Sequence, residues 1–201
     1  MTYLADGVWN HNIHHMPVLL RALPRPCGSA LEVGCGQGFL LLGLAERARR
    51  VIGVDQHQPS LAEAAERVAR LANVELVEGD VMTHDFGTTF DAVVSVAVLH
   101  HLPMDEGLAR MRDLTSPGGT VGVVGLARSR GLGDFAMDAV GFVDTRLHRL
   151  RHPHTMVTAP ICDPAESYAD VRGAADRILP GARFRRHPLF RYSLAWTKPA
   201  I

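Results

Sequence analysis

Short apolar runs alternate along the chain with segments whose apolar residues recur at helical spacing. The runs are rich in Val, Ile and Leu and predict strands over residues 30–33, 51–55, 73–79, 90–98 and 120–126. The segments between them predict helices over residues 38–49, 59–71 and 103–114. Alternation of this kind is typical of a parallel sheet flanked by helices, so we predict a doubly wound α/β fold.

The rhythm changes after residue 126. Apolar residues in 134–150 recur at the spacing of an amphipathic helix, which makes a longer link than the sheet alone needs. A further helix is predicted over 164–179, and the tail 184–197, with Pro188 between two strand-like runs, is typical of a closing antiparallel pair. We therefore divide a single domain, 1–201, into an N-terminal helical segment 1–29, a core 30–126, an insertion 127–160 and a final part 161–201.

The composition is that of an ordinary globular protein. The chain of 201 residues suffices for one domain, and 47% hydrophobic with 21% charged residues excludes wholesale disorder, collagen and coiled coil. Three cysteines, Cys27, Cys35 and Cys162, lack paired spacing, which indicates a reducing compartment rather than a disulfide framework. Because the chain shows neither a basic leader nor an apolar stretch of about 18 residues, we expect a cytoplasmic protein with no membrane partner.

Charge is balanced overall but not along the chain. Residues 1–126 hold 9 Lys and Arg against 14 Asp and Glu, a net −5, and residues 127–201 hold 12 against 7, a net +5. A basic last part could attract an acidic substrate or nucleic acid, yet its arginines are dispersed among acids, and Arg183, Arg185 and Arg186 form the only tight group. The pattern therefore favours a solvated surface over a nucleic-acid footprint.

A glycine-rich turn joins the first predicted strand to the first helix of the core. It reads Leu31-Glu32-Val33-Gly34-Cys35-Gly36-Gln37-Gly38. Three alternate glycines let the backbone turn tightly and let a ligand approach the open amides of the helix N-terminus. Tight strand-to-helix turns use glycine without any ligand, so this turn alone is weak evidence for a binding site.

Two aspartates follow the next two strands. Asp55 lies 21 residues after Gly34, where a carboxylate can accept hydrogen bonds from both ribose hydroxyls of a nucleoside. Asp80 ends the third strand at the same sheet edge and could accept from an adenine amine. The dinucleotide fingerprint requires glycine where this chain has Phe39, so the pattern favours an adenosine pocket over an NAD site. Taken singly, each aspartate could instead be a strand-end turn former.

At this point the chain resembles the class I S-adenosylmethionine-dependent methyltransferases, in particular small bacterial, actinobacterial-type, single-domain members. The resemblance covers residues 30–126 and includes the glycine turn, Asp55, Asp80, the strand 90–95 and the segment 114–119. It implies a Rossmann-like sheet of seven strands, mostly parallel with the last antiparallel, and the cofactor S-adenosylmethionine. It also implies a cofactor-binding set composed of Glu32, Gly34, Cys35, Gly36, Gly38, Asp55, Gln56, Asp80, Val81, Ser95 and Val96.

The resemblance assigns parts of the cofactor to these residues. Glu32 and the turn 34–38 would hold the methionine moiety, with Glu32 near its ammonium group. Asp55 would bind the ribose, Asp80 and Val81 the adenine, and Ser95 and Val96 would lie beside the sulfonium. The chain lacks the Asn/Asp-Pro-Pro-Tyr element of family members that methylate amino groups of bases or glutamine, which disfavours that substrate class.

Eleven histidines raise the question of a metal, and His11, His14 and His15 form the densest cluster. No acid or cysteine is spaced to complete a closed site with them, so we predict no metal. The segment 9–17 resembles N-terminal segments of some small actinobacterial-type methyltransferases that lie over the donor and acceptor sites, and we favour a lid role for it. His14, or His100 just after the fourth strand, would be the general base where the acceptor must lose a proton.

The insertion is the predicted acceptor cap. Phe135, Met137, Phe142 and Leu147 could line an apolar pocket, although a helix that packs on the sheet explains the same pattern. We therefore expect in-line methyl transfer to O, N or C of a small, partly apolar molecule, by a monomer or homodimer. Two alternatives stay open: an RNA-directed methyltransferase or adaptor that uses the basic C-terminal part, and a cofactor-binding enzyme with another outcome, such as cyclisation.

Overall fold

The computed structural model describes residues 9–131, 134–135, 137, 141–142, 145–146 and 162–200. Within them a seven-stranded sheet has the order β3-β2-β1-β4-β5-β7-β6. The strands are β1 (Cys27–Val33), β2 (Ala48–Asp55), β3 (Val74–Glu78), β4 (Phe90–Val96), β5 (Thr115–Gly125), β6 (Arg183–His187) and β7 (Arg191–Thr197). The first five pair in parallel, and β7 is antiparallel to both β5 and β6. The predicted fold class is confirmed.

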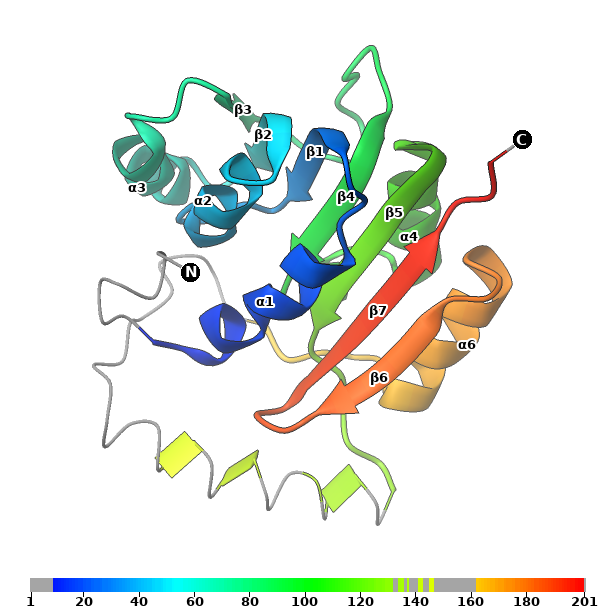
Figure 1. Cartoon of the computed structure of the whole chain (residues 1–201). Helices are drawn as coiled ribbons and strands as arrows, with labels where there is room; N and C mark the ends of the chain where they lie inside the picture. The colour runs from blue at the N-terminus through cyan, green and yellow to red at the C-terminus, as the bar shows by residue number, and fades with distance from the viewer. Residues whose placement is uncertain are drawn as a thin grey trace.

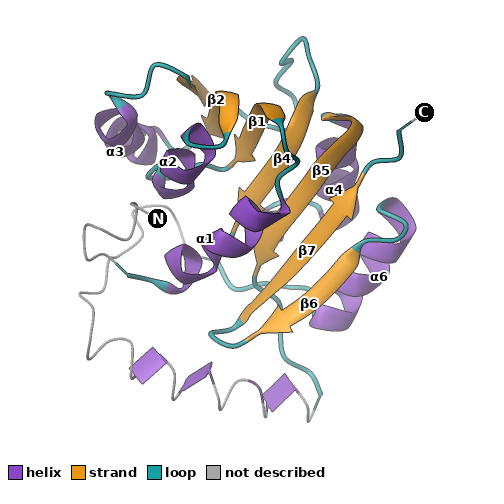
Figure 2. Cartoon of the chain, viewed as in Figure 1, coloured by secondary structure: helices purple, strands orange, loops and turns teal. Residues whose placement is uncertain are grey.

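Helices cover both faces of the sheet (Figure 1). One face carries α1 (His11–Ala22), α2 (Phe39–Ala45) and α3 (Gln58–Val68), and the other carries α4 (Met104–Asp113) and α6 (Tyr168–Ile178). Figure 2 shows the same two layers on either side of the strands. Two buried clusters result, one beneath each helical layer. The central strands are buried on both sides, which is why their sequences are nearly continuous apolar runs.

Several element ends differ from the sequence prediction. Strand β5 begins at Thr115 rather than at the predicted residue 120, because residues 116–119 lie inside the strand as an irregularity: Phe90 pairs with Thr115, but Ala92 pairs with Thr120. Helix α2 ends at Ala45, and the residues after it already belong to the approach to β2. A turn of 3-10 helix, η1 (Leu99–His101), follows β4.

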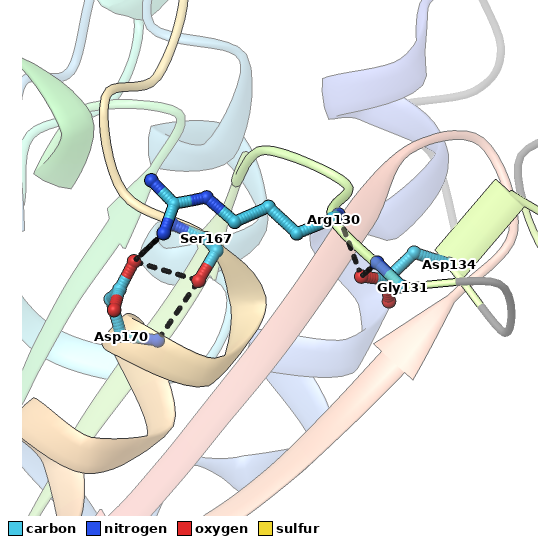
Figure 3. A network of polar contacts seen from close by, with 5 residues as sticks. All are labelled: Arg130, Gly131, Asp134, Ser167 and Asp170. Atoms are coloured by element: carbon cyan, nitrogen blue, oxygen red, sulfur yellow. Dashed lines mark hydrogen bonds and ion pairs between the residues drawn. The ribbon is translucent and has the colours of Figure 1, made fainter.

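Polar contacts join the start of α6 to the segment 130–134 that follows β5 (Figure 3). Ser167 and Asp170 form a capping box: the Ser167 side chain accepts from the Asp170 backbone N–H, and the Asp170 carboxylate accepts from the Ser167 backbone N–H. The carboxylate of Asp170 also lies 3.8 Å from the guanidinium of Arg130. The Asp134 carboxylate accepts from the backbone N–H groups of Arg130 and Gly131, which holds the pKa of Asp134 below its ordinary value. Because Ser167 caps the helix, α6 begins at Tyr168 rather than at the predicted residue 164.

Most of the predicted insertion, including Leu147, lies outside the described residues. The described part is helical at 134–135, 137, 141–142 and 145–146. Phe135 and Phe142 are 57% and 65% exposed. The acceptor-cap assignment therefore stays a prediction.

Candidate active site

A cavity of about 530 Å³ lies at the carboxyl ends of the parallel strands, where a doubly wound sheet binds its ligands. Its walls come from α1, from the loops after β1 to β5, and from β7. Among the described residues the lining includes Asn10, Asn12, Ile13, Met16, Glu32, Gly34, Cys35, Gly36, Asp55, Gln56, His57, Gly79, Val81, Val96, Ala97, Val98, His100, His101, Leu126, Cys162 and Arg191. Of the predicted cofactor set, Gly38, Asp80 and Ser95 do not line it.

The glycine turn is held in shape by the end of β2. The backbone N–H groups of Gly34 and Cys35 both donate to the carbonyl of Val54, at 2.8 and 3.1 Å. Gly34 has φ +66, and a Cβ there would lie 2.2 Å from the Val98 side chain. Glycine is therefore required at this position by backbone conformation and by space.

Asp55 organises this edge of the sheet. One carboxylate oxygen accepts from the Gly36 backbone N–H at 2.7 Å, and the other accepts from the His57 backbone N–H at 2.8 Å. The turn and the aspartate are therefore in direct contact. Each oxygen has further lone-pair capacity, so these contacts leave room for a ligand hydroxyl.

Glu32 is a buried carboxyl group at the end of β1. Its side chain is 2% exposed, and Oε2 has no hydrogen-bond partner. Burial, together with the nearby carboxylate of Asp55, holds the pKa of Glu32 well above its ordinary value near 4.5. Burial and these two carboxylates also raise the pKa of the Cys35 thiol, so this cysteine stays protonated. Among the described residues, one carboxyl oxygen of Glu32 thus has no partner in the pocket.

Of the three predicted cofactor-binding residues Asp80, Val81 and Ser95, only Val81 lines the cavity. Asp80 begins a turn: its side chain accepts from the Met82 backbone N–H at 2.9 Å. Val81, which lines the cavity, is 6% exposed. Ser95 is 1% exposed, and its hydroxyl has no partner.

The two histidines proposed as general base lie in different places. His100 lines the cavity, and its Nδ1 is buried without a partner. Burial and, to a smaller extent, the neighbouring His101 and Arg191 lower the pKa of His100 to about 4. His14 is not among the lining residues, and its ring packs edge-on against Trp9 and His15.

The histidines considered for a metal do not converge on one point. His11 lies 3.1 Å from the Thr145 hydroxyl, and the His15 ring lies 3.1 Å from the Pro188 carbonyl. A different group, His100, His101 and Cys162, brings its potential ligand atoms within 4.8 Å of one another. Within this group, a hydrogen bond of 3.2 Å joins the Cys162 thiol and Nδ1 of His101.

Arg191 and Asn12 also line the cavity, although the sequence analysis gave neither of them a role. Arg191, from β7, is 7% exposed and donates to the Asn12 side chain at 2.7 and 3.1 Å. Their separation of 179 residues gave the sequence pattern no means of pairing them.

Comparisons with known proteins agree with this architecture. A family model described as a methyltransferase domain matches residues 30–119. An uncharacterized methyltransferase of Mycobacterium tuberculosis is 34% identical over 201 residues, which cover 96% of this chain and 99% of that protein. This chain is a class I S-adenosylmethionine-dependent methyltransferase. Nocamycin O-methyltransferase of Saccharothrix syringae is 35% identical to this methyltransferase over 135 residues, 60% of this chain and 47% of that protein.

A solved structure shows the same fold. The N-methyltransferase NodS from Bradyrhizobium japonicum WM9, in complex with S-adenosyl-L-homocysteine, superposes with a TM-score of 0.63 at 17% identity. The match covers 94% of this methyltransferase and 88% of NodS.

The cavity fits the cofactor that the family uses, S-adenosylmethionine. Its volume lies within the usual range of small-molecule pockets, roughly 300–1,000 Å³. The unpartnered Glu32 carboxyl suits an ammonium group, since a buried polar atom is stabilised when a ligand completes its hydrogen bonds. Within the described residues of the methyltransferase, no helix has the length and apolarity to cross a membrane.

Proposed function

We propose that the methyltransferase transfers the methyl group of S-adenosylmethionine in line to an O, N or C atom of a small, partly apolar molecule. One observation carries this proposal: a single cavity extends from the ends of β2 and β3, beside Asp55 and Val81, to Leu126 and Arg191 at β5 and β7. The cofactor would occupy the first part and the acceptor the second. The name of the nocamycin relative, an O-methyltransferase, supports a small-molecule acceptor.

In the cofactor part of the cavity, different residues would bind different chemical groups of S-adenosylmethionine. When bound, the cofactor supplies a methyl group on a positively charged sulfur. Glu32 would bind the ammonium group, and the lining of the cavity supports the turn residues Gly34, Cys35 and Gly36 for the methionine moiety, Asp55 for the ribose, Val81 for the adenine and Val96 beside the sulfonium. Asp80 and Ser95 do not line the cavity, so their roles rest on the resemblance alone.

The acceptor part would have an apolar wall and, in His100, a side chain for proton transfer. Ile13 and Met16 of α1 line the cavity from above the sheet, which supports a covering role for the N-terminal segment. His100 would take the proton where the acceptor must lose one, because its burial keeps the imidazole neutral and its Nδ1 has no partner. His14 lies outside the lining, so we assign the base to His100. Alignment of acceptor, methyl and sulfur supplies much of the remaining rate.

Calorimetry with S-adenosylmethionine and S-adenosylhomocysteine tests the cofactor part. We expect Asp55→Ala to weaken binding at least ~10-fold, because charge-assisted hydrogen bonds to the ligand contribute ~1.5–3 kcal/mol each. Asp113→Ala is the matched control, since Asp113 is an exposed aspartate on α4. Absence of binding to folded wild-type protein would overturn the proposal.

A screen of candidate acceptors for turnover to S-adenosylhomocysteine, followed by mass spectrometry of the product, tests the reaction. Methyl transfer adds one methylene unit to the acceptor mass. Consumption of cofactor with a product of unchanged composition would instead support cyclisation or another non-transfer outcome.

A further inference from the structure

Arg191 carries a buried positive charge that no acid within the described residues neutralises. Its side chain lines the cavity from β7 and is 7% exposed. All of its hydrogen bonds go to uncharged oxygens: the Asn12 side chain, at 2.7 and 3.1 Å, and the carbonyls of Leu189 and Phe190, at 3.5 and 3.2 Å. Burial lowers the pKa of Arg191 only to about 10, so the guanidinium is charged at neutral pH.

This arrangement is incomplete on both charge and hydrogen-bond grounds. A guanidinium has five N–H donors, and the four contacts above leave at least one without a partner. Burial of a charge without a counter-ion is costly, because neutral oxygens replace only part of its hydration. The cost would be offset by a ligand that brings a negative oxygen to the guanidinium.

The ionisable groups near Arg191 do not supply that negative charge. The positive charge of Arg191 lowers the pKa of both His15 and His100, in addition to the larger effect of burial. The acids that line the cavity, Glu32 and Asp55, lie in the last residues of β1 and β2, on the other side of β4 and β5 from β7. The cavity is thus acidic where the positively charged cofactor would bind and basic where the acceptor would bind.

We propose that Arg191, positioned by Asn12, binds an anionic oxygen group of the acceptor, so that the substrates of this methyltransferase carry a carboxylate or a phosphate ester. This inference rests on the proposed function, because it concerns the acceptor part of the same cavity. The rival explanation is structural: Arg191 joins α1 to the turn before β7, where Leu189 and Phe190 have φ of +62 and +59. A purely structural arginine would not distinguish a charged ligand from a neutral one of the same shape.

The test uses protein loaded with S-adenosylhomocysteine and three probes with one aromatic ring: phenylpropionate, its carboxamide and phenyl phosphate. Calorimetry of the loaded wild-type protein should show the carboxylate or the phosphate binding at least about tenfold more tightly than the carboxamide. The tighter of the two anions identifies the class of acid. Equal affinity for acid and amide, including no detectable binding of either, would overturn the inference.

Variants separate recognition from folding. Arg191→Gln should remove the preference for the anion and leave the affinity for S-adenosylhomocysteine unchanged, whereas Arg191→Lys should retain a weaker preference. Arg185→Gln, the same change on the exposed surface of β6, is the control and should behave as wild type. A preference that survives Arg191→Gln would refute the role of Arg191. If that variant does not fold, the wild-type and Arg191→Lys measurements decide.

These outcomes differ from failure of the proposed function. Loss of S-adenosylhomocysteine binding in the wild type would remove the cofactor assignment. Normal cofactor binding without discrimination between acid and amide would remove only the acceptor assignment.

Discussion

Replacement of Glu32 by glutamine should stabilise the ligand-free methyltransferase and lower its affinity for the cofactor. The ligand-free pocket contains a fully buried carboxyl group whose Oε2 has no partner. The substitution removes the charge and preserves the shape. Stability and binding should therefore move in opposite directions, which is unusual for a change in a core strand.

The size of the stability effect can be bounded from the acid–base chemistry of Glu32. If the buried carboxyl takes up a proton to avoid its charge, protonation costs about 1.36 kcal/mol for each pH unit above the ordinary value near 4.5, which sets an upper bound of about 3 kcal/mol at pH 7. The amide of Glu32→Gln avoids this cost but still lacks a full set of partners. We expect a gain of about 1–3 kcal/mol, or about 2–4 °C in melting temperature per kcal/mol.

The pH dependence gives an independent check of the sign. Because the pKa of Glu32 is raised in the folded state, the folded protein binds more protons than the unfolded chain above pH 4.5. Wild-type stability from this group is therefore present at low pH and is lost as pH rises through the raised pKa. The advantage of Glu32→Gln should be large near pH 7 and should vanish toward pH 4.5.

The assay combines urea denaturation at several pH values with calorimetry. Loss of a charge-assisted contact of about 1.5–3 kcal/mol should weaken S-adenosylmethionine binding about 10- to 150-fold. Glu66→Gln, an exposed position on α3, is the matched control and should change neither quantity. A destabilised Glu32→Gln that binds the cofactor like the wild type would refute the reasoning.

Three further predictions concern the turn, the cap of α6 and a buried histidine. Gly34→Ala should lose at least about 2 kcal/mol in chemical denaturation, since its Cβ would lie 2.2 Å from Val98 and its φ is +66; wild-type stability would contradict this. Ser167→Ala should cost about 1 kcal/mol, because it removes the cap that accepts from the Asp170 N–H; Ser167→Asp should recover most of it. Burial lowers the pKa of His15 to about 3, so the folded state resists protonation and loses stability as pH falls below 6.5; His15→Gln should show a shallower acid loss in urea midpoints, and an unchanged slope would exclude this group.

Much of the fold was predictable because the spacing of apolar residues within short segments indicates which segments form strands and which form helices. Continuous apolar runs predicted the buried parallel strands. The glycine turn and Asp55 were predicted to face one ligand, and the structure brings them together through a hydrogen bond of 2.7 Å from the Gly36 N–H to the carboxylate. The irregularity in β5 escaped prediction because a Ser-Pro-Gly-Gly sequence is the same whether it turns the chain or bulges within a strand.

The cavity wall around Arg191 was not predictable for a physical reason. Nothing near Arg191 in sequence indicates that the arginine is buried, since its partner Asn12 belongs to the first helix. The three arginines at 183–186 were predicted to be solvated, and Arg183 and Arg185 are exposed. Arg186 instead lies over the Tyr168 ring at 4.0 Å and pairs with Asp134.

The contact between Gly36 and Asp55 can form earlier during synthesis than the contact between Asn12 and Arg191. The turn–aspartate contact joins residues 19 positions apart, so it can form soon after β2 emerges from the ribosome. The link between Asn12 and Arg191 spans 179 positions and must wait for almost the entire chain. The edge around Asp55 can therefore form before β6 and β7 are synthesised, and substitutions in this final hairpin should alter the cavity wall around Arg191 with little effect on that edge.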